Sequence, residues 1–425
     1  MQRQQARSVL AAPAGSQSFI DFRSLFLTIA VLVVIDTGPI QNAILVLTGV
    51  RVRLDVMTIF VAAVVFVTIQ KHANRIIDNI NLTLLILIAI ILASSQWSNS
   101  TIAKGEYTFQ LLTIVPTCYS LGLCAAQTRL NYLCIGFISI AVMTYLFFNP
   151  DFSSGGATDA IGTYQVYAQC YLLSYISSLL MLLFYMKNNI GRLILAVIAS
   201  ASIFAMLQTG GRGGMAGAVL ATAAIGLYRF PRQRYLIIFS ALFVVIVGLV
   251  YVDDIIYFMT VLSSEFKLFS IERMLLKILN PVADDRFYSR DSLAAAGLSV
   301  WLEHPFLGAG LGGFPYAANL GDDPGNYPHN VFVEILAEQG IFGFIIFMYL
   351  LALSAKRFLD TKKYLTPFHT ALMSAWSVAT LAKSWTSGHF VGDTQLLFMI
   401  GLVVGLSWEY HADTKSVVGR RKATA

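Results

Sequence analysis

Charged residues are scarce in this chain of 425 residues, where only 12% are Asp, Glu, Lys or Arg and 57% are hydrophobic. Soluble globular domains average about 25% charged residues, so this composition excludes a water-soluble enzyme. The formal net charge is +6, but a basic balance in so apolar a chain gives no case for nucleic-acid binding. The chain is therefore predicted to be an integral membrane protein whose main surroundings are the lipid bilayer.

Cysteine is also rare, and internal repeats and low-complexity tracts are missing. The four cysteines lie inside apolar segments and have no ligand-type spacing with one another or with histidine: Cys118, Cys124, Cys134 and Cys170. We expect buried free thiols, which excludes a disulfide scaffold and a zinc site. No cofactor is expected.

Apolar runs of roughly 17–25 residues recur along the chain, as a hydrocarbon core of about 30 Å demands. Helices are expected because lipid offers backbone groups no other hydrogen-bond partners. The predicted fold class is all-α, a polytopic membrane protein of about twelve transmembrane helices with one long, partly helical periplasmic loop. The expected spans are 24–49, 54–70, 80–95, 108–126, 131–148, 164–186, 193–208, 214–228, 235–252, 331–353, 366–382 and 395–408.

The arrangement of basic residues predicts the topology. Most of the 29 basic residues fall in connectors on the side of the N-terminus, which makes that side and both termini cytoplasmic. The long loop then faces outward, with an interfacial helix expected at 262–280, a second helix at 291–303 and a turn-rich segment after it. The chain divides into membrane helices 1 to 9 (1–252), the periplasmic loop (253–330), and helices 10 to 12 with a cytoplasmic tail (331–425).

Arg212 opens the eighth predicted span in the segment TGGRGGMAG, on the side where basic residues are few. A charge near lipid is costly, and the flanking Gly211 and Gly213 allow close approach of a ligand to the backbone. A helix N-terminus favours anions, so this end is a candidate phosphate site. The alternative is an interfacial arginine, with Gly213 and Gly217 providing a small-residue packing face.

Arg286 and Arg290 lie four residues apart in DDRFYSRDSL, so one helical turn would place them on the same face. Two guanidinium groups there need an anion, and a diphosphate could be bound in a bidentate manner. A local salt-bridge network with Asp284, Asp285 and Asp291 is the alternative.

His329 stands just before the tenth predicted span, at the outer side. A neutral imidazole in that position could accept a proton from a hydroxyl group, whereas a lone histidine is more often structural. Asn330 is expected to cap the following helix. Glu334 could orient the His329 ring or simply face water together with Glu338.

Two other patterns are not interpreted as sites. Gly308, Gly310 and Gly313 match G-x-G-x-x-G, but no strand precedes them and no βαβ unit is available, so the dinucleotide-binding interpretation is rejected. Pairs of aspartates could bind a divalent ion, yet turn and helix-cap roles are favoured for each pair. These pairs are Asp253/Asp254, Asp284/Asp285 and Asp322/Asp323.

Taken together, three motifs make the chain similar to a known family. TGGRGG surrounds Arg212, Arg290 lies fifteen residues before Pro305, and His329-Asn330 is followed by nine residues and Gly340. In this order on one outer face, the motifs resemble the bacterial O-antigen ligase and polysaccharide polymerase superfamily. The resemblance covers most of the chain and is strongest from about residue 209 to 343.

The resemblance implies glycosyl transfer at the periplasmic face of the bacterial inner membrane, from a glycan on undecaprenyl diphosphate to a sugar hydroxyl or a lipid-linked acceptor. Arg212 and Arg290 would hold the diphosphate, His329 would activate the acceptor hydroxyl, and Arg286 matches the family pattern less well. A metal-independent, inverting reaction is expected because arginines supply the positive charge. A flippase and a chain-length regulator are possible partners.

Three functions are weighed. A polymerase of O-antigen or exopolysaccharide repeat units is favoured over a ligase that transfers glycan to lipid A core, although both need the same donor site. A transporter is the alternative from another class. Ion-coupled transporters usually place acids near the middle of the membrane, and Asp36 is the only clear acid deep in a predicted span. The two halves of the chain also lack the similarity of transporter repeats.

Overall fold

The computed structural model describes residues 22–35, 40, 78–126, 128, 130–147, 164–209, 212–235, 257–258, 260–261 and 290–423. The predicted spans at 54–70 and 235–252 lie outside these ranges entirely or nearly so, as does the expected interfacial helix at 262–280. Within the described ranges the secondary structure is helical, without a strand. The chain is therefore an all-α membrane protein, as its composition predicts.

The helices follow the apolar runs closely. Four of the described helices are long and apolar enough to cross a membrane, and several shorter apolar helices accompany them. The helices are α2 (Phe22–Ile35), α5 (Asn79–Ser94), α6 (Ile102–Ala125), α7 (Leu130–Phe147), α8 (Tyr164–Leu180) with a π-helical extension (Met181–Tyr185), α9 (Asn189–Thr209), α10 (Arg212–Arg229), α14 (Arg290–Glu303), α15 (Phe314–Ala317), α16 (Val331–Thr361), α17 (Pro367–Ser387) and α18 (Thr394–Ala423). Short 3-10 turns lie at Pro231–Gln233 and Phe390–Gly392.

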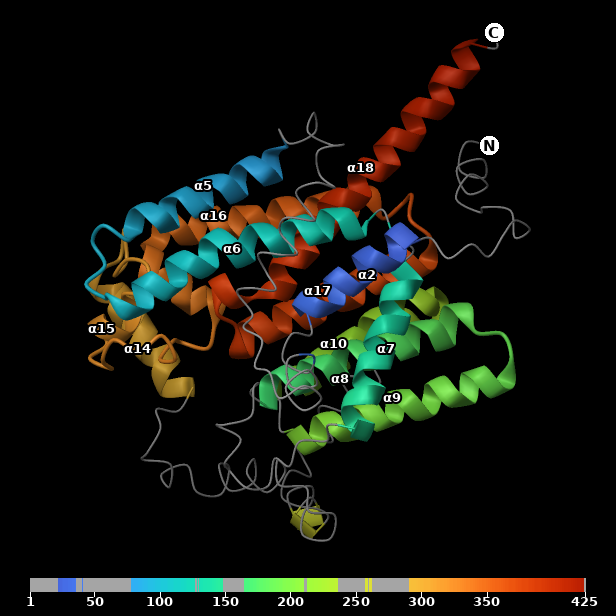
Figure 1. The fold of residues 1–425 in the computed structure, drawn as a ribbon, viewed down its shortest axis with the longest axis horizontal. Helices are drawn as coiled ribbons and strands as arrows, with labels where there is room; N and C mark the ends of the chain where they lie inside the picture. Colours follow the sequence, from blue (N-terminus) through green and yellow to red (C-terminus); the bar gives the residue numbers. More distant parts are fainter. Residues whose placement is uncertain are drawn as a thin grey trace.

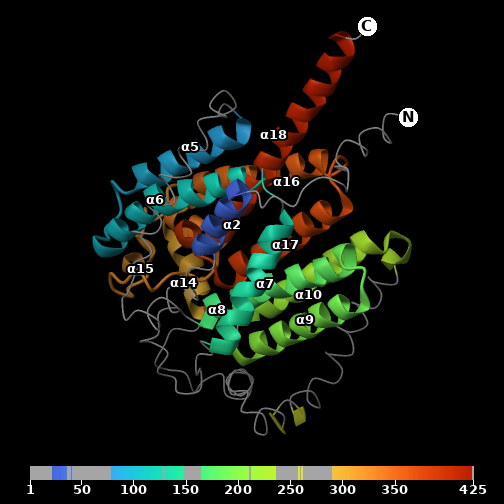
Figure 2. The ribbon, with the colours of Figure 1, turned by 45° about the vertical axis from the view of Figure 1, so that its right-hand side comes forward.

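The helices form one bundle with two distinguishable parts. Figures 1 and 2 show one part in which α5 lies beside α16 and α6 lies beside α18, and another in which α8, α9 and α10 lie together. The two parts are joined by α17, which packs against both α10 and α18. In Figure 1, α14 and α15 lie at one end of the bundle, and the C-terminal end of α18 extends from the other.

Glycines allow α6 and α18 to cross closely. A methyl group on Gly122 of α6 would lie 2.6 Å from the backbone nitrogen of Leu402, and one on Gly405 of α18 would lie 2.6 Å from the carbonyl oxygen of Leu123. Gly401 and Gly405 of α18 have the small-xxx-small spacing that permits such backbone contact in a bilayer, where packing and not hydrophobicity drives helix association. This crossing ties the end of the chain to its first half.

Contacts between connectors define one end of the bundle, which we call the site end. Gly310 packs against Ser94 and Ser98, and Gly388 packs against Val331 and Ser384. The site end therefore consists of the connectors 95–101, 304–330 and 388–393, together with the first turns of α10 and α16. At the opposite end Arg357 forms an ion pair of 2.9 Å with Asp78.

The predicted span at 331–353 corresponds to α16, which is long and apolar enough to cross a membrane but is interrupted at Gly340. The backbone of Gly340 has φ 62° and ψ −166°, a conformation that is essentially restricted to glycine. A methyl group there would also collide with the backbone of Phe306 and lie 2.6 Å from the nitrogen of Leu307. A short helix of residues 331–339 therefore stands at the site end, and a separate helix of residues 341–361 follows it.

Candidate active site

His329 is positioned by the start of α16. Its backbone has φ 55°, an uncommon value for a residue other than glycine, and its side chain is half-buried. Asn330 is the N-cap, since its side-chain oxygen accepts hydrogen bonds from the backbone nitrogens of Phe332 (3.0 Å) and Val333 (3.2 Å). The expected cap is thus confirmed, and it fixes where the chain turns into the helix.

Four aromatic rings lead from α6 to His329, and we call them the ring stack: Tyr107, His389, Tyr327 and His329. Consecutive ring centroids are 4.3 Å, 5.1 Å and 4.1 Å apart. The Tyr107 hydroxyl donates to the carbonyl oxygen of Pro324 at 2.8 Å, which fastens the segment before His329 to α6. The ring stack therefore joins three separate parts of the chain.

Glu334 holds His389 and not His329. One carboxylate oxygen of Glu334 lies 2.7 Å from Nδ1 of His389, and the other accepts the backbone N–H of Phe390 at 3.1 Å. The side chain of Glu334 is 4% exposed and that of His389 is 14% exposed. Both expectations for Glu334, orienting His329 or facing water, are wrong, because the 388–393 connector folds over it.

Glu338 does not face water either. It is buried, and its side chain accepts the backbone N–H of Gly312 at 3.1 Å. The backbone nitrogens of Ala309 and Gly310 donate to the carbonyl oxygens of residues 337 and 338, each at 2.8 Å. The glycine-rich segment thus satisfies the end of the short helix of α16, and its glycines serve close backbone packing, in agreement with the rejection of a nucleotide site.

Asp322 caps α6 from the tip of the 304–330 connector. Its carboxylate accepts from the backbone nitrogens of Thr101 (2.8 Å) and Ile102 (2.9 Å) and from the hydroxyl of Ser100 (2.5 Å). These hydrogen bonds, first of all the one from Ser100, hold the pKa of Asp322 well below its usual range. Asp323 accepts from Gly325 N–H at 2.8 Å, so this pair has the cap and turn roles that were favoured for it.

The two arginines of the motifs stand at the described starts of two helices. Arg212 begins α10, and Arg290 begins α14. Gly213 is buried against α17, where a methyl group would lie 2.5 Å from the Oγ1 atom of Thr386, so the packing interpretation applies to this glycine. Gly211 and Arg286 lie outside the described residues.

Packing places the start of α14 near the start of α16. Gly297 of α14 faces Val333 and Pro328, with contacts of 2.6 Å and 3.3 Å for an added methyl group. Val300 shares a small core with Ala337, so α14 and the short helix of α16 run in the same direction. From Gly297 the helix continues for about two turns, roughly 10 Å, towards Arg290.

A buried ion pair lies beside the start of α10. Lys383 Nζ is 2.9 Å from Oδ1 of Asp393, whose side chain is 0% exposed. Ser384 donates to the other carboxylate oxygen at 2.5 Å. A carboxylate as buried as that of Asp393 requires a charged partner, which Lys383 provides. The ion pair joins the end of α17 to the start of α18.

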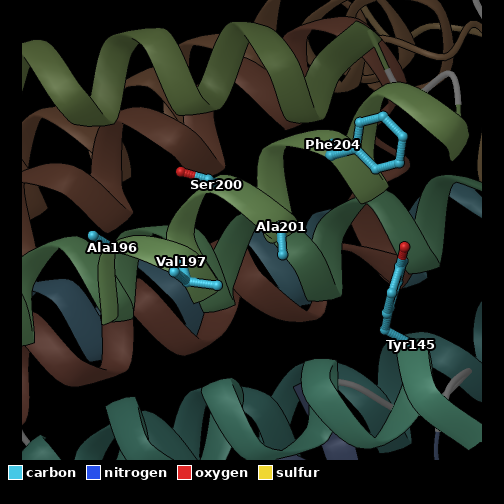
Figure 3. A pocket seen from close by; sticks show the side chains of 6 residues that line it. All are labelled: Tyr145, Ala196, Val197, Ser200, Ala201 and Phe204. Carbon is cyan, nitrogen blue, oxygen red and sulfur yellow. The ribbon is translucent and has the colours of Figure 1, made fainter. Parts of the chain in front are cut away.

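A hollow of about 480 Å³ lies between α7 and α9. Figure 3 shows the small side chains of α9 along it, with Tyr145 and Phe204 near one end. The lining residues are Tyr145, Ala196, Val197, Ser200, Ala201 and Phe204. The hollow is mostly apolar and open to the outer surface of the bundle. It lies along residues 196–204 of α9, which ends at Thr209, so it is within a few helical turns of Arg212 along the chain.

All four cysteines are buried free thiols, as expected. Tyr107 and His389 are the residues of the site end that the motifs did not single out. The signal that the sequence offered for His389 was a histidine in SGHFVGD, a connector that follows a predicted span and is predicted to face outward. Tyr107 had none, because its partners are distant in the sequence.

Comparison with known families matches residues 194–348 to the family described as O-Antigen ligase. The match includes α10, α14, the short helix of α16 and the residues Arg212, Arg290 and His329. No curated protein matches the chain. The resemblance to the O-antigen ligase and polysaccharide polymerase superfamily is confirmed, and it supports glycosyl transfer of the O-antigen ligase type.

Proposed function

Because residues 194–348 match the family described as O-Antigen ligase, we propose that this protein transfers a glycan from undecaprenyl diphosphate to a sugar hydroxyl and so polymerises O-antigen or exopolysaccharide repeat units. The reaction takes place at the periplasmic face of the bacterial inner membrane. About twelve membrane helices anchor the site, with both termini in the cytoplasm and the 253–330 loop in the periplasm.

One observation carries the proposal: the N-termini of α10, α14 and α16 converge at the site end. Gly213 of α10 packs on Thr386 of α17, Gly388 packs on Val331 of α16, and Gly297 of α14 faces Val333. Helix N-termini carry partial positive charge and free N–H groups. With Arg212 and Arg290 at the described starts of α10 and α14, this end suits a diphosphate placed beside His329.

The chemistry follows from these residue types. His329 accepts the proton of the acceptor hydroxyl, the oxygen forms a bond to the anomeric carbon, and the bond from that carbon to the carrier diphosphate breaks. The electron pair leaves with the diphosphate, whose added negative charge Arg212 and Arg290 stabilise. A single displacement of this kind inverts the anomeric carbon and uses no metal ion.

The donor's lipid chain needs apolar surface next to its diphosphate. The hollow between α7 and α9 lies within a few turns of Arg212 along the chain, and we propose that the polyprenyl chain lies on this face. A flippase that delivers the donor and a regulator of chain length are proposed partners.

Ligation to lipid A core is the second candidate, and the description of the matched family favours it directly. A ligase and a polymerase need the same donor site and the same base. They differ only in the acceptor, which is a sugar hydroxyl of another lipid-linked repeat unit in one case and the core oligosaccharide of lipid A in the other. Ion-coupled transport receives no support from the buried acids, because Glu334, Glu338 and Asp393 each have protein partners.

The test is complementation of a null strain with wild type, Arg212→Ala, Arg290→Ala or His329→Ala. Gel electrophoresis of the glycans and an immunoblot of membrane levels are the two readouts. Arg192→Ala and His304→Ala serve as matched controls, since Arg192 is an exposed residue at the opposite end and His304 is exposed in the 304–330 connector. We expect the three site variants to be present but inactive and both controls to be active.

The phenotype of the null strain separates the two candidates. Single repeat units attached to lipid A core indicate a missing polymerase, whereas accumulated lipid-linked polymer indicates a missing ligase. Normal polymer in all three site variants would overturn glycosyl transfer at this site and leave transport as the leading function.

A further inference from the structure

We propose that His389 is a positioning residue, which Glu334 orients and which holds the His329 ring in place through Tyr327. The inference rests on the proposed function for the role of His329 as a base. It concerns a histidine outside the matched region 194–348, contributed by the connector between α17 and α18.

The protonation of His389 follows from its contact with Glu334. Both carboxylate oxygens of Glu334 are acceptors, one facing Nδ1 of His389 at 2.7 Å and the other receiving the Phe390 N–H at 3.1 Å. A carboxylate in this arrangement requires that Nδ1 carry the proton. The contact therefore fixes the tautomer and the orientation of the ring, as a carboxylate does for many functional histidines.

The other nitrogen of His389 shows that the residue does not act on substrate directly. Nε2 is buried and has no hydrogen-bond partner within the described part of the chain. A buried polar atom without a hydrogen-bond partner is disfavoured. If this position only filled space, phenylalanine or leucine would therefore be more stable than histidine. What the histidine provides is a flat ring whose angle is set by a hydrogen bond.

The ring of His389 transmits this orientation to His329. It lies against Tyr107 on α6 at 4.3 Å and against Tyr327 at 5.1 Å, and Tyr327 in turn lies 4.1 Å from His329. The backbone on this path is restrained as well, because Tyr107 hydrogen-bonds to the carbonyl of Pro324 at 2.8 Å. One face of the His329 ring is therefore covered by a side chain that is itself held from behind.

A general base needs such restraint, because an error of about 1 Å in its position can reduce the rate by roughly 100-fold. Asn330 restrains the backbone next to His329 through the helix cap and does not itself set the rotamer of the imidazole. The covering ring of Tyr327 limits that choice. His389 and Glu334 supply the support that keeps Tyr327 in place.

The experiment measures the reactivity of His329 and needs no glycan. The purified full-length protein in detergent is treated with diethyl pyrocarbonate, and mass spectrometry gives the modification rate at each histidine. The variants are His389→Asn, whose amide can still donate to Glu334 but has no ring, together with Tyr327→Leu and Tyr327→Phe. His304, which is exposed, serves as the internal reference, and His369, which is half-buried, reports unfolding.

We expect His389→Asn and Tyr327→Leu to raise the rate at His329 by a factor of about three to ten, since the ring gains rotamers. Tyr327→Phe, which retains the ring, should match wild type. The proposal is overturned if His329 reacts at the wild-type rate in both His389→Asn and Tyr327→Leu. It is also overturned if Tyr327→Phe and Tyr327→Leu change that rate equally. If His389→Asn unfolds, as a rise at His369 would reveal, the two Tyr327 variants decide.

Polymer formation by the same variants in the null strain gives the second readout. We expect His389→Asn to lower polymer yield about tenfold at equal membrane level. Because the reactivity of His329 is measured without substrate, failure of the positioning role and failure of the glycosyl-transfer function are distinguishable: the first leaves His329→Ala inactive, and the second leaves it active.

Discussion

Replacing Gly340 by alanine should destabilise the protein strongly, because both the backbone conformation and the space around this residue exclude a side chain. The backbone of Gly340 has φ 62° and ψ −166°, and holding a residue with a side chain in that region costs about 1–3 kcal/mol. The added methyl group would also meet the backbone of Phe306 and the nitrogen of Leu307 at 2.6 Å, where no flexible side chain can move aside. Overpacking adds about 1–3 kcal/mol, so the expected loss is about 2–6 kcal/mol.

Two other glycines separate the contributions. Gly321 has φ 84° but open space around it, so Gly321→Ala should show the backbone cost alone, about 1–2 kcal/mol. Gly105 lies in α6 with a helical backbone and nothing within 4 Å of an added methyl group. Gly105→Ala should therefore leave stability unchanged or raise it by about 0.5–1 kcal/mol, because alanine is the better helix former.

The assay is reversible unfolding of the purified protein in mixed micelles with an increasing fraction of denaturing detergent, followed by tryptophan fluorescence. The expected order of stability is Gly105→Ala, wild type, Gly321→Ala and then Gly340→Ala. The reasoning is refuted if Gly340→Ala is as stable as Gly105→Ala, since α16 would then tolerate a continuous helix.

Two further predictions concern charged groups of the site end. Asp322→Asn should lower the melting temperature at pH 7, because the carboxylate that caps α6 is lost. The pKa of Asp322 is depressed from its ordinary value of 3.8, so the contribution of this carboxylate to stability is full above that pH and disappears as pH falls through the lower folded-state pKa. The melting temperatures of wild type and Asp322→Asn should therefore approach each other as pH falls below 3.8. A difference that stays constant with pH would contradict the assignment. Lys383→Met should cost about 3–5 kcal/mol in the same unfolding assay, because it leaves the fully buried Asp393 without a cation. The double variant Lys383→Met with Asp393→Asn should recover part of this loss. If the double variant is as unstable as the single variant, the ion pair is not the cause.

The sequence predicts the helices well where local pattern determines them. The spans expected at 80–95 and 193–208 correspond to α5 and α9 within a few residues, because long apolar runs between polar connectors leave little choice in lipid. The expected helix at 291–303 and the cap at Asn330 also agree with the structure, since both depend on neighbouring residues.

Features that depend on distant contacts could not be predicted. The span expected at 108–126 begins earlier, at Ile102, because Asp322 caps it from 221 residues away in the sequence. The break at Gly340 is hidden in a continuous apolar pattern, because it is the backbone of Phe306 that occupies the space. The partner of Glu334 was missed for the same reason, since His389 approaches it from another connector.

The close crossing of α6 and α18 also constrains how the protein is made. About 270 residues separate the end of α6 from the start of α18, and a ribosome adds roughly 5–20 residues each second. For roughly 15 to 55 s, therefore, the face of α6 around Gly122 has been synthesised but its partner has not. During this interval lipid or an insertion factor must cover that face. Tyr107 of α6 likewise has no contact with His389 until that residue has been synthesised. A chain stopped before His389 would contain three rings of the ring stack and lack the one that lies between Tyr107 and Tyr327.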